Sequence, residues 1–285
     1  MKCDLHVHTV HSGMCTVAFV DRICRESYTT AEQAYVTLKR LGMDLVTITD
    51  HDSLGAMEVL GRYPDFFASE EVSVELPSGT RVHVAVYDLT ERQHVEVQRR
   101  AKDVEAFTAY CDEQGLFFSV NHVFSSLTGR RAESDFEWFA ERFPGLEVRN
   151  GAMLGAANRA AAELCQRWGK APVAGSDAHA LRSVGRAYTE VPGARNKQEF
   201  LAGLRAGHGI ARGGDGSYFL LTAEVLSIVR SLLLERPWTA ALLPLLAMLP
   251  LVLLLNYAKE TWFAACWQAR LRARLLAAPS LEISG

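Results

Sequence analysis

The sequence has no paired-cysteine motif and no apolar segment at its N-terminus. Its six cysteines show neither a CxxC pair nor a regular spacing: Cys3, Cys15, Cys24, Cys111, Cys165 and Cys266. This pattern argues against a disulfide framework and a thiolate zinc site, and it fits a reduced intracellular setting. Because Asp and His residues stand where a secretory signal has its apolar h-region, we expect the N-terminal part to stay in the cytoplasm.

The chain also lacks an excess of positive charge, since its 30 Lys and Arg residues are outnumbered by 33 Asp and Glu residues and its formal net charge is −3. A protein that holds nucleic acid mainly through phosphate contacts needs a basic surface. We therefore expect no stable nucleic-acid partner, although a small nucleotide would need only a local positive site.

Up to about residue 210 the sequence alternates short apolar runs with amphipathic stretches, a pattern typical of β-α units around a parallel sheet or barrel. Thr30 and Gln33 form a capping box for a helix that ends near Gly42, and the run "MDLVTIT" then predicts a buried strand. Further helices are predicted over 91–114, 134–143 and "AANRAAAELCQRW", and further strands over "DFFASEEVS", "TRVHVAVYDL", "LFFSVNH", "LEVRN" and "APVAGSD".

The composition changes after the Gly-rich stretch 211–219, which predicts a first domain over 1–216 and an apolar helical tail over 217–285. Residues 237–258 include nine Leu and no charged residue. A helix of this length can cross an apolar layer of roughly 30 Å, so a membrane segment is predicted. A long buried helix pair in a soluble protein is the alternative, and a hairpin with "YFLLTAEVLSIVRSLLL" as its first leg would keep both ends inside.

Three polar residues alternate near the start of the chain, because "CDLHVHT" contains Asp4, His6 and His8. Side chains alternate across a strand, so these three point to one face, with successive members roughly 7 Å apart. Two imidazoles so placed can converge on a metal ion, or they can form the solvated face of an edge strand. The rest of the sequence decides between the two interpretations.

Further candidate metal ligands follow, and most stand at the end of a predicted strand. They occur in "TDHD", "SEEVS", "VNH" and "GSDAH", whereas His83 lies inside the apolar strand "RVHVAV". The carboxyl ends of parallel strands form one rim where ligands gather. Histidine and carboxylate ligands without thiolates suit zinc, manganese or iron. The sequence therefore predicts a shared metal site at this rim.

In their order and approximate spacing these motifs resemble those of the PHP family, named for polymerase and histidinol phosphatase. "VGRAYT" looks like the family's common sequel, and the resemblance covers about residues 3–210. It implies a distorted (β/α)7 barrel that is followed here by the C-terminal apolar helical segment, with two or three divalent metal ions in the mouth of the barrel. It also implies eight metal ligands: His6, His8, His51, Glu71, His83, His122, Asp177 and His179.

The family pattern assigns these ligands to three metals. The first metal is held by His6, His8, Glu71 and Asp177. Glu71 bridges to a second metal held by His83 and His122, and the third metal is served by His51 and His179. Glu71 is preferred to Glu70 because it directly precedes "VS". The chain departs from the pattern in "HTVHSGMC", where an aspartate commonly follows the serine, so the third metal lacks a ligand. His11 is either that ligand or a loop histidine facing solvent.

Three further residues are candidates for supporting roles. Asp4 is expected to orient His6 or His8 by accepting a hydrogen bond, and Asn150 either supports a ligand or caps a turn. Arg186 in "VGRAYT" is expected to contact a substrate phosphate.

The resemblance implies a metal-dependent phosphoesterase that hydrolyses a small phosphorylated substrate through a metal-activated water. A phosphomonoester, a nucleotide or the end of an oligonucleotide would fit. The alternatives are a histidinol-phosphatase-like enzyme and a membrane-tethered metal-binding module without turnover. Under each of them, we expect a cytoplasmic catalytic or binding domain attached to the membrane by the C-terminal segment.

Overall fold

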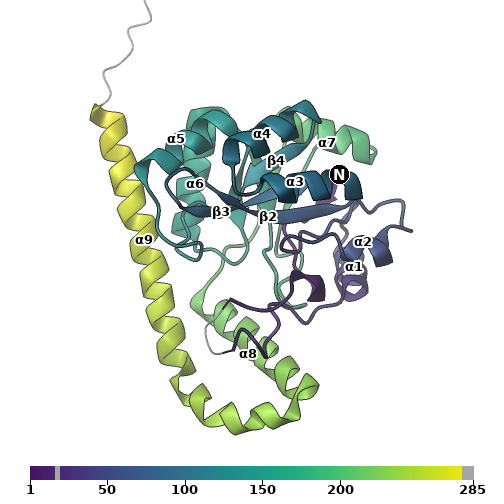
Figure 1. Cartoon of the computed structure of the whole chain (residues 1–285), viewed down its shortest axis with the longest axis vertical. Helices are drawn as coiled ribbons and strands as arrows, with labels where there is room; N and C mark the ends of the chain where they lie inside the picture. The colour runs from purple at the N-terminus through teal and green to yellow at the C-terminus, as the bar shows by residue number, and fades with distance from the viewer. Residues whose placement is uncertain (17–19, 278–285) are drawn as a thin grey trace, which may run out of the picture.

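Two β-sheets form the centre of the protein in the computed structural model, which describes residues 1–16 and 20–277. The larger sheet has the order β2-β3-β4-β5-β6, and the smaller has the order β1-β7-β8. Their strands are β1 (Lys2–Cys3), β2 (Ser69–Glu75), β3 (Arg81–Tyr87), β4 (Phe117–Val120), β5 (Gly145–Asn150), β6 (Ala171–Gly175), β7 (Ala187–Glu190) and β8 (Ile210–Gly213). The protein is therefore of the α/β class (Figure 1).

The larger sheet is mixed, which corrects the expectation of an all-parallel arrangement. β3 runs antiparallel to both β2 and β4, whereas β4-β5 and β5-β6 are parallel. Only the turn 76–80 separates β2 from β3. Because a parallel crossover needs a dozen or more residues, so short a connection can join only antiparallel strands.

Two extended segments, 4–8 and 45–51, lie between β6 and β2. The first is joined to β6 by the hydrogen bond from Leu5 N to Ala174 O and by a parallel bridge between Val7 and Ala178. The second is bridged to the β2 side by the pairs Val46–Phe66 and His51–Glu71. These contacts are isolated, so among the described residues the sheets do not form a continuous closed barrel, and "MDLVTIT" is not a regular strand.

Helices pack around the two sheets, and most of them begin at a capping residue. The predicted capping box at Thr30 and Gln33 begins α1, and the predicted helix over 91–114 is divided in two where Asp103 caps a new helix. The helices of this region are η1 (Val10–Ser12), α1 (Ala31–Arg40), α2 (Ala56–Leu60), α3 (Glu91–Arg100), α4 (Val104–Glu113), α5 (Glu133–Arg142), α6 (Gly155–Trp168) and α7 (Lys197–Arg205).

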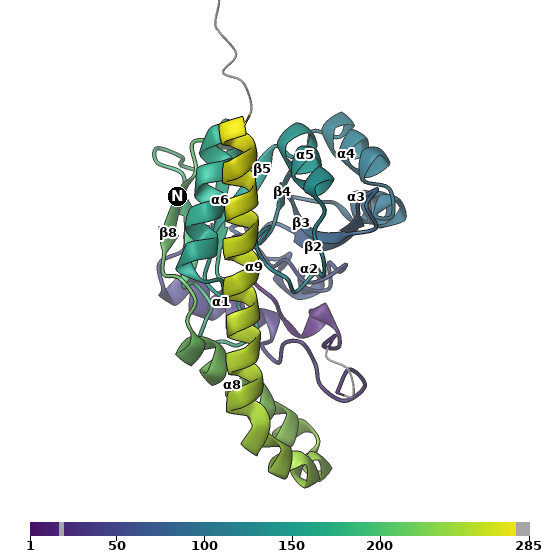
Figure 2. The ribbon, with the colours of Figure 1, turned by 90° about the vertical axis from the view of Figure 1, so that its left-hand side faces the viewer.

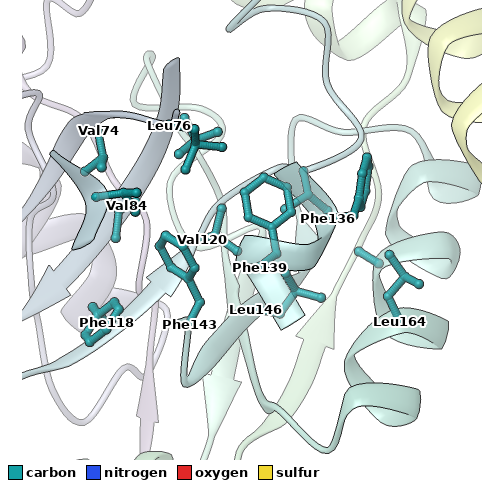
Figure 3. Close-up of a cluster of buried hydrophobic side chains, with 14 of the residues drawn as sticks. Val74, Leu76, Val84, Phe118, Val120, Phe136, Phe139, Phe143, Leu146 and Leu164 are labelled. Atoms are coloured by element: carbon teal, nitrogen blue, oxygen red, sulfur yellow. The ribbon is translucent and has the colours of Figure 1, made fainter. Parts of the chain in front are cut away.

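Alternation along the strands separates an apolar outer face from a polar inner face. Figure 3 shows side chains of the outer face, such as Val84 and Phe118, with Phe139 of α5 and Leu164 of α6. The intervening positions include inward-pointing polar residues, among them Glu71, His83 and Glu147. Ala85 and Tyr87 of β3 belong instead to a second buried apolar cluster. The sheet thus carries a hydrophobic core on its outer side, and both titratable groups and a smaller apolar cluster on its inner side.

The tail forms a helical hairpin in which α8 (Tyr218–Glu235), the 3-10 segment η2 (Pro237–Met248) and α9 (Leu249–Ala277) follow one another. Both views place η2 at the end of the molecule farthest from the sheets (Figures 1 and 2). The second half of α9 returns along α6, where Ala264, Trp267 and Leu271 join the core of the larger sheet. Both ends of the hairpin are therefore attached to the same body.

Candidate metal centre

The N-terminal extended segment places His6 and His8 side by side at the centre of the site. Both rings are buried, and their Nε2 atoms lie 3.0 Å apart. Asp4 fixes the backbone around them, since its Oδ1 accepts from His6 N at 3.2 Å and Ser176 N at 2.8 Å, and its Oδ2 accepts from Gly185 N. Asp4 thus contacts the backbone of His6, and neither imidazole.

Glu71 on β2 lies among five histidine rings. Its Oε1 is 3.3 Å from both His6 Nε2 and His122 Nε2. Its Oε2 lies within 3.5 Å of a ring nitrogen of the three others: His8, His51 and His83. Asn121 Nδ2 donates to Oε1 at 2.8 Å. Nearly every neighbour of this carboxylate is a group that can bind a metal.

The side chain of Glu70 points away from the site in which the Glu71 side chain lies. Successive side chains on a strand point to opposite faces, and Glu70 points outward to α3. There its Oε2 lies 2.9 Å from His94 Nδ1 and accepts from Gln98 Nε2 at 2.7 Å. Both glutamates are buried, so they differ in the direction of the side chain rather than in exposure.

The reversed direction of β3 explains the place of His83 inside an apolar strand. β2 and β4 both run antiparallel to β3, so the beginning of β3 lies at the same edge as the ends of its two neighbours. His83 pairs with Ser73 on β2, and His122 follows the end of β4. The two histidines consequently reach the same site from opposite ends of their strands.

Glu26 adds a carboxylate to the third group of predicted ligands. Its Oε1 is 3.3 Å from His51 Nε2 and 3.5 Å from His179 Nε2. It lies in an irregular segment after the first motif, so no periodicity in the sequence pointed to it. His11 lies elsewhere, with its ring beside Gly55.

Four groups of three ligand atoms, each within 4.8 Å of one another, occur in the part of the chain that the structure describes. They are His6–His8–Asp177, His6–Glu71–His122, His51–Glu71–His83 and His8–His51–His179. Together they contain all eight predicted ligands. The grouping differs in detail from the family pattern, because His122 is grouped with His6 and His83 with His51.

Glu147 on β5 supports two of these histidines. Its Oε1 lies 2.8 Å from His6 Nδ1, and its Oε2 accepts from His122 N at 2.8 Å. Asn150 Nδ2 donates both to Glu147 Oε2 and to Asp177 Oδ2 at 3.0 Å. Glu147 therefore orients the ring of His6, the part that the sequence suggested for Asp4. A buried charge inside the apolar run "LEV" was the available signal.

The backbone is strained at the edge of the site. In the described chain, positive φ outside glycine occurs at Asp52, Asp88, His122 and Asp177, and all but Asp88 border the pocket. Such conformations cost of order 1–3 kcal/mol each. Hydrogen bonds from their backbone amides hold all three residues that border the pocket, from His122 N to Glu147, from Asp177 N to His6 O at 2.7 Å and from Asp52 N to Glu71 O at 3.0 Å.

Buried carboxylates shift the pKa values of the histidines. Burial alone would lower the pKa of His6, but Glu71, Asp177 and Glu147 outweigh it and raise that pKa well above its usual value. For His8 burial is likewise outweighed, by contacts with Asp177 and Glu71, and its pKa rises to about 10. Burial dominates at His83, whose pKa is lowered.

These properties fit divalent cations. In the described part of the chain, Glu71 Oε2 and His122 Nδ1 are buried without a hydrogen-bond partner, although such atoms ordinarily have one. The pKa of His8, raised to about 10, keeps this imidazole protonated at neutral pH, and a cation can take the place of its proton. The donor set of imidazole and carboxylate suits zinc, manganese or iron.

The ligands open into a pocket of about 640 Å³, a volume typical of small-molecule sites. Met14 and Leu127 contribute apolar side chains to its lining, and Arg81 contributes a cationic one that the sequence did not single out. Arg186 is outside this lining, and its guanidinium donates to Asp215 O at 2.9 Å. Arg81 is thus better placed than Arg186 to meet a substrate.

The fold and the ligand cluster define an α/β protein with groups of histidine and carboxylate side chains that could hold metal ions. The sequence model of the PHP-associated family matches residues 155–208. No curated protein matches the chain. This match supports the resemblance to the PHP family that the order of the ligand motifs indicates.

Two solved structures share the fold. A two-domain protein from Bacteroides vulgatus, described as containing a predicted PHP-like metal-dependent phosphoesterase, is 17% identical with a TM-score of 0.58 and covers 80% of this chain and 69% of its own. PsfC from Pseudomonas syringae is 19% identical with a TM-score of 0.58 and covers 80% of this chain and 98% of its own.

Proposed function

We propose that this protein is a metal-dependent phosphoesterase that hydrolyses a small phosphorylated substrate. The observation that carries the proposal is the cluster around Glu71, where five histidine rings surround one buried carboxylate and two of them, His6 and His8, are also grouped with Asp177. Bound divalent ions would supply charge stabilisation for a phosphate ester and would lower the pKa of a water molecule. The ligand set fits two or three ions of manganese, zinc or iron.

Residues of the chain perform the remaining tasks. Glu147 orients the His6 ring, and Asn150 fixes the carboxylates of Glu147 and Asp177 by donating a hydrogen bond to each. Arg81 can bind a phosphate oxygen through its guanidinium, which the pocket lining places near the ligands. His51 and His179 with Glu26 offer a third position next to the first two.

The proposal also includes a barrel arrangement, a division into domains and attachment to a membrane. The segments 4–8 and 45–51 together with β2 to β6 make seven extended pieces, and their isolated bridges support a distorted (β/α)7 barrel. We assign the hydrolase domain to residues 1–216 and the tail to 217–285. Pro237–Ala273 is long and apolar enough to cross a membrane by length and composition, which supports membrane attachment of a cytoplasmic domain.

The experiment is a metal analysis of the full chain combined with a substrate panel. The panel contains phosphomonoesters including histidinol phosphate, dinucleotides and short oligonucleotides, each assayed after chelation and after manganese or zinc is restored. We expect turnover of a phosphate ester that is lost on chelation and regained with metal. If two or more metals bind per chain while no ester is hydrolysed, the protein is a metal-binding module and the proposal is wrong.

A further inference from the structure

The exposed surface of the hairpin is unusual for a water-soluble protein. Leu245 of η2 is 66% exposed, Leu255 of α9 is 61% exposed, and several other large apolar side chains beside them are also exposed: Leu234, Trp238, Leu243, Met248, Leu251, Val252 and Leu254. Residues 237–258 contain no charged side chain. A contiguous apolar surface of this kind marks an interaction with a membrane or a protein.

The geometry favours insertion into one leaflet over a complete crossing. In α9 only the part from Leu249 to Ala258 precedes the contacts with the body, and ten helical residues span about 15 Å, half of an apolar layer of roughly 30 Å. Beyond it Glu260 accepts hydrogen bonds from Ser125 Oγ and Ser126 N, each at 3.0 Å. Because α8 and α9 both end on the same body, the hairpin enters from one side.

Three connections link the hairpin to loops that line the metal pocket. Glu224 Oε1 of α8 accepts from the backbone of the predicted ligand His179 at 3.0 Å and from Ala180 at 3.1 Å. Glu235 at the end of α8 accepts from Arg25 Nε at 2.9 Å, next to Glu26. Glu260 of α9 holds the loop that continues into Leu127. The pocket therefore has a fixed position relative to the apolar surface.

The lining of the pocket becomes apolar on the sides formed by these loops. Leu127, 67% exposed, follows the serines bound by Glu260, and Met14 precedes the segment 20–28 that contacts α8. Val20 of that segment lines an apolar cavity of about 210 Å³ together with Leu242 and Leu246 of η2. Apolar side chains therefore line both the metal pocket and a second cavity beside the hairpin.

We propose that the substrate is a phosphate ester of a membrane lipid, a proposal that rests on the phosphoesterase function above. The phosphate lies at the metal ligands, while the acyl chains remain in the leaflet that holds the hairpin. Water supplies the oxygen of the new P–O bond, the P–O bond to the lipid alcohol breaks, and a proton from water ends on that alcohol. A lipid phosphomonoester then yields the free alcohol and inorganic phosphate.

The test compares two esters that share a head group. The full chain with manganese is assayed on phosphatidylcholine vesicles containing phosphatidic acid, and separately on glycerol phosphate, which lacks the acyl chains. We expect kcat/KM to be at least about tenfold higher for the vesicle substrate, because insertion concentrates enzyme and lipid on one surface. Vesicles of phosphatidylcholine alone show whether a lipid phosphodiester is also cleaved.

Paired variants separate the hairpin from the chemistry. The double variant Leu245→Glu with Leu255→Glu should lose vesicle binding and most vesicle activity, while its activity on glycerol phosphate stays within about twofold. Val95→Glu is the control, because Val95 is 60% exposed on α3 and away from the hairpin. Equal or faster hydrolysis of glycerol phosphate by the wild type would overturn the lipid proposal and leave the phosphoesterase function standing. Loss of all ester hydrolysis with metal bound would overturn both.

Discussion

In the metal cluster, carboxylates and imidazoles such as Glu71 and His8 are almost completely buried. In the hairpin, leucines such as Leu245 and Leu255 are mostly exposed. Folding alone favours neither arrangement, because burying a charge and exposing a large apolar surface both cost free energy. Each region is completed by something outside the chain, divalent cations at the first and a lipid leaflet at the second in our proposals. Substitutions in one region, followed by measurements of both metal-dependent activity and vesicle binding, therefore test both proposals.

The largest effect is expected from Glu71→Gln. The substitution keeps the size of the side chain but removes the charge that five histidine rings surround. Because metal ions contribute several kcal/mol of charge stabilisation, we expect kcat/KM to fall at least about a thousandfold. Metal content per chain, measured by elemental analysis, should fall in parallel, whereas vesicle binding through the hairpin should not change.

Glu70→Gln is the matched control for this variant. It changes an adjacent glutamate of equal burial that contacts His94 and Gln98. We expect full metal content and activity within a few-fold of the wild type. Equal losses in the two variants would show that general destabilisation, and not ligation, explains the effect.

A smaller loss is expected from Glu147→Gln. The carboxylate lies 2.8 Å from His6 Nδ1 and fixes the orientation of that ring. Removing such a partner of a metal ligand typically costs about 10- to 100-fold in metal affinity. Competition with a chromophoric chelator measures this affinity. An unchanged affinity would mean that the His6 ring is held by its other neighbours.

Glu147 also marks the limit of what the sequence could reveal. The eight proposed ligands could be picked out because each occurs in a motif of the resemblance, and all eight lie in the cluster. Glu147 and Glu26 lie outside these motifs, and only the fold brings them to His6 and His51. The direction of β3 could have been read from its short turn, whereas the bridges of segments 4–8 and 45–51 depend on contacts remote in sequence.

Metal binding and vesicle binding should differ in their dependence on pH. His8 has a pKa of about 10 in the metal-free protein because Asp177 and Glu71 outweigh its burial, so it is protonated at pH 7. A metal ion must displace that proton, and affinity should rise with pH by about tenfold per unit for each proton released. Residues 237–258 contain no Asp, Glu, His, Lys or Arg, so binding to neutral vesicles should not vary between pH 6 and 8.

Calorimetry provides the measurement. Titrating manganese into the metal-free chain, in buffers that differ in ionisation enthalpy, counts the protons released. We expect at least one proton per chain at pH 7. Zero release would contradict a protonated His8.

The smallest effect is expected where the two regions meet. Glu224 of α8 accepts hydrogen bonds from the backbone amides of His179 and Ala180, so it joins the hairpin to a predicted ligand. Glu224→Gln keeps an oxygen acceptor but removes the charge, and charge-assisted hydrogen bonds are about twice as strong as neutral ones. We expect a two- to threefold loss of kcat/KM, which corresponds to roughly 0.5 kcal/mol. Vesicle binding should not change, because the exposed apolar surface of the hairpin is intact. If vesicle binding fell while activity on glycerol phosphate was unaffected, Glu224 would support the hairpin alone, and the metal site would be independent of the membrane.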